Sequence, residues 1–169
     1  MLIDCSYFTK GSRQILNCTV GTLPNPNAQE VMKSIEAYIA ENQEQFLLRM
    51  LGSSVANKVH NYLVCQDEDG AVKRIESIDD VCSRLRESFA DYVFFQILRT
   101  ANTRATINGL VVLKISDTHV APLRRQVVAW NTMVDRNNLF AQWCKTDQCK
   151  LTGIKISDAM LTKINSLNL

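Results

Sequence analysis

The dipeptide Asn108-Gly109 constrains the fold of this chain more than any other feature. The tight two-residue turn of a β-hairpin needs positive φ at both central residues, which Asn and Gly tolerate best. Residues 103–107 lead into this turn, and the apolar run 110–115 leads out of it. We therefore predict a β-hairpin at about 103–115. Because an isolated two-stranded hairpin is marginal in water, it must pack on helices or pair with another chain.

The rest of the chain has the apolar periodicity of amphipathic helices. The first predicted helix follows Asn27 as N-cap and stops at Gly52, and a second begins at Ser53. The longest runs from Ser77 or Asp79 to about residue 99, and another carries Pro122 in its first turn. A last, short helix is expected at about 157–167. The fold class is mainly α: a helical bundle of about four to five helices with one inserted β-hairpin and an extended N-terminal arm.

Three segments follow from this pattern. Residues 1–27 are expected to form the extended arm, 28–150 the helical domain with its hairpin, and 151–169 a C-terminal segment with a short helix. The long third helix should bury an apolar stripe made of Ile78, Val81, Cys82, Leu85, Phe89, Tyr92, Val93 and Leu98, widened by Phe94 and Phe95. The helix after the hairpin should bury Leu123, Val127, Trp130, Val134 and Phe140 or Trp143.

Hydropathy and charge limit the classes of partner. No apolar run approaches the roughly 20 residues of a membrane span, and the N-terminus lacks a signal-peptide pattern, so we expect a cytoplasmic protein without membrane contact. Residues 28–98 carry seven Lys/Arg and twelve Asp/Glu, a net charge of −5, whereas residues 99–136 carry six and two, a net charge of +4. Either these are solvated helix faces, or they are an acidic and a basic surface that meet between copies or meet nucleic acid.

Catalytic chemistry finds little support in the sequence. It has no nucleophile elbow, zinc-protease, P-loop or dinucleotide-binding motif, and only two histidines, His60 and His119. Cys144 and Cys149 form a C-x4-C pair, but a zinc site would need two more ligands, so free thiols are the simpler interpretation. We expect no enzyme, no cofactor and no metal. An enzyme of another type would have to use Cys144, Cys149 or His119.

Nucleic-acid binding is the main alternative to a structural role. Arg104, Arg124 and Arg125 are the candidate contacts for DNA or a partner. However, a pI near 8.2 and the lack of a dense basic stripe do not suit a dedicated DNA-binding domain. The sequence is compatible with proximity to double-stranded DNA through phosphates, without sequence readout.

Three strings resemble one family. The segment 35–59, IEAYIAENQEQFLLRMLGSSVANKV, has an acidic amphipathic helix, then F-L-L-R-M-L-G, then a second helix. The segment 88–112, SFADYVFFQILRTANTRATINGLVV, is a helix running into a Thr/Gly-rich hairpin, and 121–135, APLRRQVVAWNTMVD, contains the distinctive A-W-N-x-M-V. Together these resemble the head–tail connector, or neck, proteins of tailed phages and prophages of Bacteroidetes. The N-terminal arm, the C-terminal segment and the six cysteines are not part of the match.

The resemblance implies a non-enzymatic subunit that forms a ring between portal and tail around the DNA channel. Its partners would be copies of itself, the portal protein and a tail-adaptor protein, in the host cytoplasm during assembly and then in the virion neck. The hypothesis for the subunit or portal contact is the hairpin, with Ile107, Asn108, Gly109, Leu110 and Val112. The alternative is a small nucleic-acid-binding regulatory protein.

Overall fold

The computed structural model describes residues 1–16, 18, 26–69, 74–101, 103–106, 109–112 and 122–165. Four long helices dominate this part of the chain: α1 (Pro26–Leu51), α2 (Ser53–Asp69), α3 (Glu76–Ala101) and α4 (Pro122–Trp143). They confirm the predicted helical bundle. Short 3-10 helices are η1 (Cys5–Phe8), η2 (Gly11–Arg13) and η3 (Asp158–Met160), and the strands are β1 (Thr103–Thr106) and β2 (Gly109–Val112). No described helix is both long enough and apolar enough to cross a bilayer.

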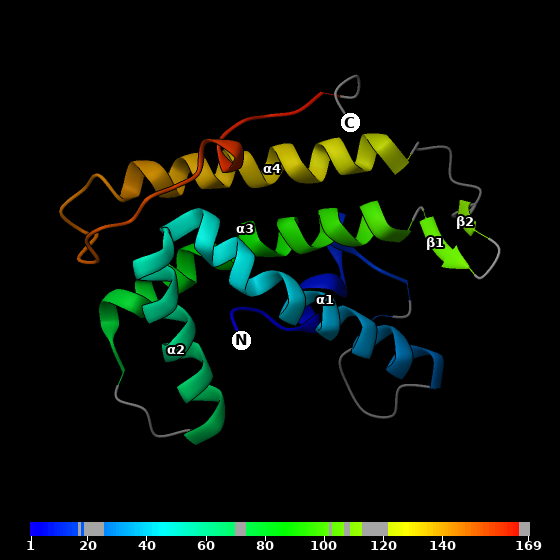
Figure 1. The fold of residues 1–169 in the computed structure, drawn as a ribbon, viewed down its shortest axis with the longest axis horizontal. Coiled ribbons are helices and arrows are strands. Elements are labelled where there is room, and N and C mark those ends of the chain that lie inside the picture. The colour runs from blue at the N-terminus through cyan, green and yellow to red at the C-terminus, as the bar shows by residue number, and fades with distance from the viewer. Residues whose placement is uncertain are drawn as a thin grey trace.

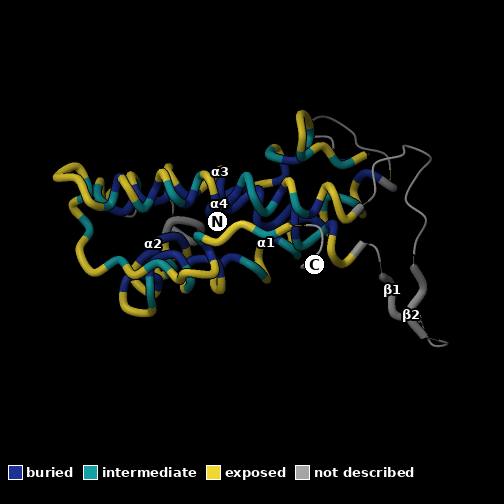
Figure 2. The backbone as a smooth tube through the Cα atoms, turned by 90° about the horizontal axis from the view of Figure 1, so that it is seen from above, coloured by how far each residue is buried: buried dark blue, intermediate teal, exposed yellow. Residues whose placement is uncertain are grey.

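The central element is α3, which packs between α4 and α1 (Figure 1). Every residue of its predicted apolar stripe is buried, as Figure 2 shows by the dark blue of the layer that α3 and α4 share. Its aromatic side chains meet α1, because Phe46 lies 5.0 Å from Phe89 and 5.4 Å from Tyr92 between ring centroids. The predicted core of α3 is therefore confirmed.

The inner face of α4 agrees with the prediction at Val134, Phe140 and Trp143, which are buried, and differs from it at other positions. Leu123 is exposed and Val127 and Trp130 are only half buried, whereas Gln126, Met133 and Asn137 are buried. Gln126 Nε2 donates to the Leu98 carbonyl of α3 at 3.0 Å, and Asn137 accepts a short hydrogen bond from the Ser88 hydroxyl. Two of the inward positions are thus polar residues that are satisfied by α3, which a search for apolar spacing does not detect.

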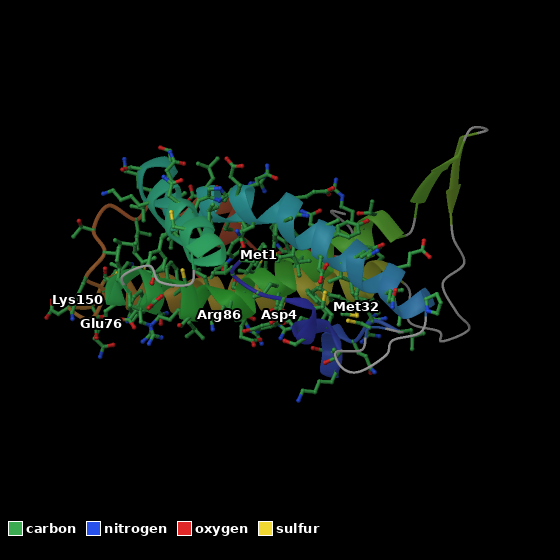
Figure 3. All side chains as sticks on the ribbon, turned by 90° about the horizontal axis from the view of Figure 1, so that it is seen from below. Met1, Asp4, Met32, Glu76, Arg86 and Lys150 are labelled. Carbon is green, nitrogen blue, oxygen red and sulfur yellow. The ribbon has the colours of Figure 1, made fainter. Side chains whose placement is uncertain are left out.

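The N-terminus is not the extended arm predicted. Residues 4–13 form η1 and η2, and the segment inserts Leu2, Ile3, Cys5 and Phe8 into the core. Figure 3, seen from below, shows this dark-blue segment passing from the side of α3 that carries α1 to the opposite side. These apolar side chains pack against the molecule's own helices, and their burial stabilises the folded position of the segment.

The predicted C-terminal helix at about 157–167 is also wrong, because within its described part, residues 157–165, only Asp158–Met160 is helical, as a single 3-10 turn. We call residues 150–164 the C-terminal strap. Its Lys155 and Ser157 amides donate to the Leu51 and Arg49 carbonyls, at 3.1 and 2.8 Å. These are last-turn carbonyls of α1, which lack partners within the helix. The strap therefore caps the C-terminal end of α1 with two of its backbone amides.

The ends of two other helices differ from prediction. The first helix begins at Pro26, a residue suited to the first helical position, rather than after Asn27. The second continues through Asp69, whereas the polar run 66–70, QDEDG, favours a loop from the sequence alone.

Strands β1 and β2 pair antiparallel, with Thr103 opposite Val112 and Thr106 opposite Gly109. Gly109 was predicted as a central turn residue and instead belongs to β2. Ile107 and Asn108 lie outside the described residues, so the predicted turn itself is untested.

Candidate interface: an arginine-lined hollow

A hollow of about 230 Å³ opens on the side of α3 opposite α1, where η2, α3 and α4 meet. We call it the arginine hollow. Its walls combine guanidinium groups with apolar side chains, and they comprise Ser12, Arg13, Asp91, Phe94, Arg124, Arg125, Val128, Ala129 and Thr132. Three arginines against one carboxylate make this surface attractive to an anionic group.

Asp91 is the anchor of the hollow's inner wall. Its side chain is 5% exposed, and its carboxylate pairs with Arg13 at 2.9 Å and with Arg136 at 3.0 Å. Burial raises the pKa of Asp91, and the two guanidinium groups counter that rise. A carboxylate this buried needs both partners, since losing either leaves part of its charge uncompensated.

Glu87 lies one helical turn before Asp91 and shares the same two arginines. Its carboxylate is 2.6 Å from Arg13 and 3.0 Å from Arg136. Burial alone would raise the pKa of Glu87, but the hydrogen bond from Arg13 and the charges of both arginines outweigh it and lower that pKa. The four residues form one network that ties η2 to α3 and α4.

Arg124 and Arg125 remain available to a partner. Both are exposed in the first turn of α4. The Arg125 guanidinium lies over the Phe94 ring at 5.4 Å, which is close enough for a cation–π contact and fixes its position without neutralising its charge. Arg124 forms no ion pair within the part of the chain that the structure describes. The positive end of the α4 dipole adds to the attraction for an anion.

A second, shallower hollow continues the same surface beyond the Arg136–Glu87 pair. It is lined by Arg84, Glu87, Arg136, Leu139 and Phe140. The Arg84 guanidinium covers the Trp143 ring at 4.4 Å, and Leu139 is 65% exposed. The surface is thus arginine-rich with isolated apolar side chains, a composition typical of protein interfaces.

Of the predicted contact residues, the structure places Arg124 and Arg125 together at the hollow. The side chains of Arg104, Leu110 and Val112 lie outside the described part, as do Ile107 and Asn108 entirely. The sequence prediction missed Arg13 and Arg136. The spacing Glu87–Asp91 places two like charges one turn apart on the same helix, and such a pair is a sequence signal for partners of opposite charge.

The cysteines form no site of obvious chemistry. Burial raises the pKa of Cys144 to about 12, and the neighbouring Cys149 thiol adds to the rise. Within the described residues, no group of three or more His, Cys, Asp or Glu side chains could hold a metal ion. His60 Nδ1 is buried and has no hydrogen-bond partner in the described part, and His119 lies outside it.

A comparison of this chain with protein-family models, with curated proteins and with solved structures gives no match.

Proposed function

We propose that this protein is a non-enzymatic structural subunit that assembles head-to-tail with copies of itself. The observation that carries the proposal is the distribution of charge across α3. The arginine hollow lies where η2, α3 and α4 meet, whereas α1, which packs on α3 through Phe46, carries the exposed Glu30, Glu41 and Glu44. Two different, complementary patches are what a heterologous interface requires.

A ring is the closed form of such a contact, because repeated head-to-tail contacts close when the rotation between subunits permits it. This agrees with the resemblance to head–tail connectors, in which the ring would join portal and tail adaptor around double-stranded DNA. In this proposal, the hairpin residues Leu110 and Val112 contribute the subunit or portal contact. Replacing either with Asp should then block assembly and leave a folded monomer.

The test is the molar mass in solution by light scattering over a wide range of protein concentration, followed by electron microscopy of the largest species. A defined oligomer with ring-shaped particles would support the proposal. A monomer at every concentration would contradict self-assembly.

The second candidate is a small nucleic-acid-binding regulatory protein, which the arginine-rich surface favours. It predicts saturable DNA binding that weakens as salt rises and that falls when Arg124 and Arg125 are changed to Ala. Fluorescence anisotropy with a labelled DNA duplex measures both effects. A salt-dependent signal that the alanine variant keeps would place the DNA contact elsewhere.

A further inference from the structure

We propose that the arginine hollow receives the α1 helix of a second copy of this chain, with Glu41 and Glu44 opposite Arg124 and Arg125. This inference rests on the head-to-tail assembly proposed above and names the surfaces that meet. Charge is the first reason. Glu41 and Glu44 are exposed, and within the described residues neither forms an ion pair, so both have charge available for a partner.

Spacing along the two helices is the second reason. On α1, Glu44 is followed four residues later by Leu48, which is 47% exposed. On α4, Arg124 is followed four residues later by Val128, which is 55% exposed and lines the hollow. Four residues rise about 6 Å along any α-helix. Two helices that approach in parallel therefore align the ion pair and the apolar pair together.

The size of the hollow also favours side chains over a small molecule. Its volume of about 230 Å³ is below the roughly 300–1,000 Å³ of typical ligand pockets. Its apolar wall of Phe94, Val128 and Ala129 suits the methylene groups of Glu and the body of Leu48. Its rim holds the arginines that would bind the carboxylates in a bidentate manner.

A chain cannot place its own α1 carboxylates in its own hollow. On α3, Asp91 and Phe94 line the hollow, whereas Phe89 and Tyr92 on the other face of the helix pack against Phe46 of α1. The α1 carboxylates of a chain therefore cannot reach its own hollow. The contact must be made between copies, and a pair joined by one contact keeps a free hollow on one copy and a free α1 face on the other. This leads to a ring or a filament rather than to a closed dimer.

The experiment uses two charge-reversed variants of the full chain. The hollow variant carries Arg124→Glu and Arg125→Glu, and the α1 variant carries Glu41→Lys and Glu44→Lys. Each should weaken self-association by about 100-fold or more, because like charges then face each other. An equimolar mixture should recover the wild-type molar mass by light scattering, since each reversed patch then meets a complementary one.

The matched control carries Lys58→Glu and Lys145→Glu, two exposed positions away from both patches that give the same change in net charge as the hollow variant. It should assemble as the wild type does. Circular dichroism checks that each variant is folded. Recovery of the wild-type molar mass in the mixture excludes misfolding as the cause of lost assembly.

The outcomes separate this inference from the proposed function. A wild-type chain that stays monomeric overturns both. A wild-type oligomer that the two reversals leave intact overturns only the α1-in-hollow contact, as does loss of assembly without recovery in the mixture. If the hollow reversal abolishes binding to a DNA duplex but leaves assembly intact, the hollow binds phosphates and the inference is wrong.

Discussion

The side-chain amide of Asn131 forms two hydrogen bonds with the backbone of Ile164. Its Nδ2 donates to the Ile164 carbonyl at 2.9 Å, and its Oδ1 accepts from the Ile164 amide at 2.9 Å. The carboxamide thus satisfies the backbone N–H and C=O of Ile164, as a neighbouring β-strand would do for an extended segment. Trp130, the residue before it, donates from Nε1 to the Thr162 carbonyl at 2.9 Å. The A-W-N string of α4 is therefore the clamp of the C-terminal strap.

Replacing Asn131 with Ala should lower the free energy of unfolding by about 1–3 kcal/mol, because two backbone groups lose their partners. The strap should also become sensitive to proteases. Asn138→Ala is the matched control, since the Asn138 amide donates only to the Val134 carbonyl within its own helix. Urea unfolding and limited proteolysis measure both effects, and equal loss in the two variants would argue against the clamp.

Gly52→Ala should destabilise the protein more than Gly11→Ala. Both glycines have positive φ, +76° and +78°, so both substitutions carry the backbone strain of a left-handed residue, about 1–2 kcal/mol. A Cβ at Gly52 would also lie 3.1 Å from the Lys155 Cβ of the strap, whereas one at Gly11 meets nothing within 4 Å. The difference between the losses of unfolding free energy in the two variants isolates this contact. Equal losses would mean that the strap moves away from the added methyl group without a cost in free energy.

Glu87→Gln should reduce stability at neutral pH by up to about 1 kcal/mol, a modest value because the carboxylate is half exposed. The pKa of Glu87 is lowered in the folded state, so its stabilising effect is present above the ordinary value of 4.5 and is lost as pH falls through the lowered one. The variant and the wild type should therefore converge in strong acid. Unfolding titrations at pH 7 and pH 3 test this, with Asp147→Asn, an exposed carboxylate outside both patches, as control.

Thiol labelling of the native protein should proceed rapidly at Cys65, the exposed cysteine. Burial raises the pKa of Cys5 and Cys144 to about 12 and that of Cys82 to about 11, so these side chains are almost entirely protonated at pH 8. Because the thiolate is the reactive form, they should react slowly. Cys65→Ser should remove the fast phase, and a fast phase that persists would identify a reactive thiol and reopen the enzymatic alternative.

The sequence predicted α3 well because nearly all of its inward residues are apolar. On α4 it placed Val134, Phe140 and Trp143 correctly. It missed Gln126 and Asn137 because their hydrogen-bond partners lie far along the chain. Asn137 also donates to the Met160 carbonyl at 2.8 Å, so its burial depends on the strap. Periodicity reports hydrophobicity, and it cannot anticipate polar side chains that tertiary partners satisfy.

The site was predicted in part. Arg124 and Arg125 stand out because two adjacent arginines open a helix. Arg13 does not, since its partners Glu87 and Asp91 are separated from it by 74 and 78 residues. The N-terminal segment was predicted as extended because Gly11, Gly21 and the run 24–27, PNPN, break regular structure. The packing of Phe8 and its neighbours against the helices explains its folded course.

The position of Arg13 also has a consequence for the order of synthesis. Translation at about 5–20 residues per second separates Arg13 from Asp91 by roughly 4–16 seconds. During that interval α1 is completed, and η1 contacts this helix, with the Leu2 amide bonded to Gln43. The carboxylates that pair with Arg13 do not yet exist, so the N-terminal segment packs on α1 first and Arg13 stays without an ion-pair partner until α3 is synthesised.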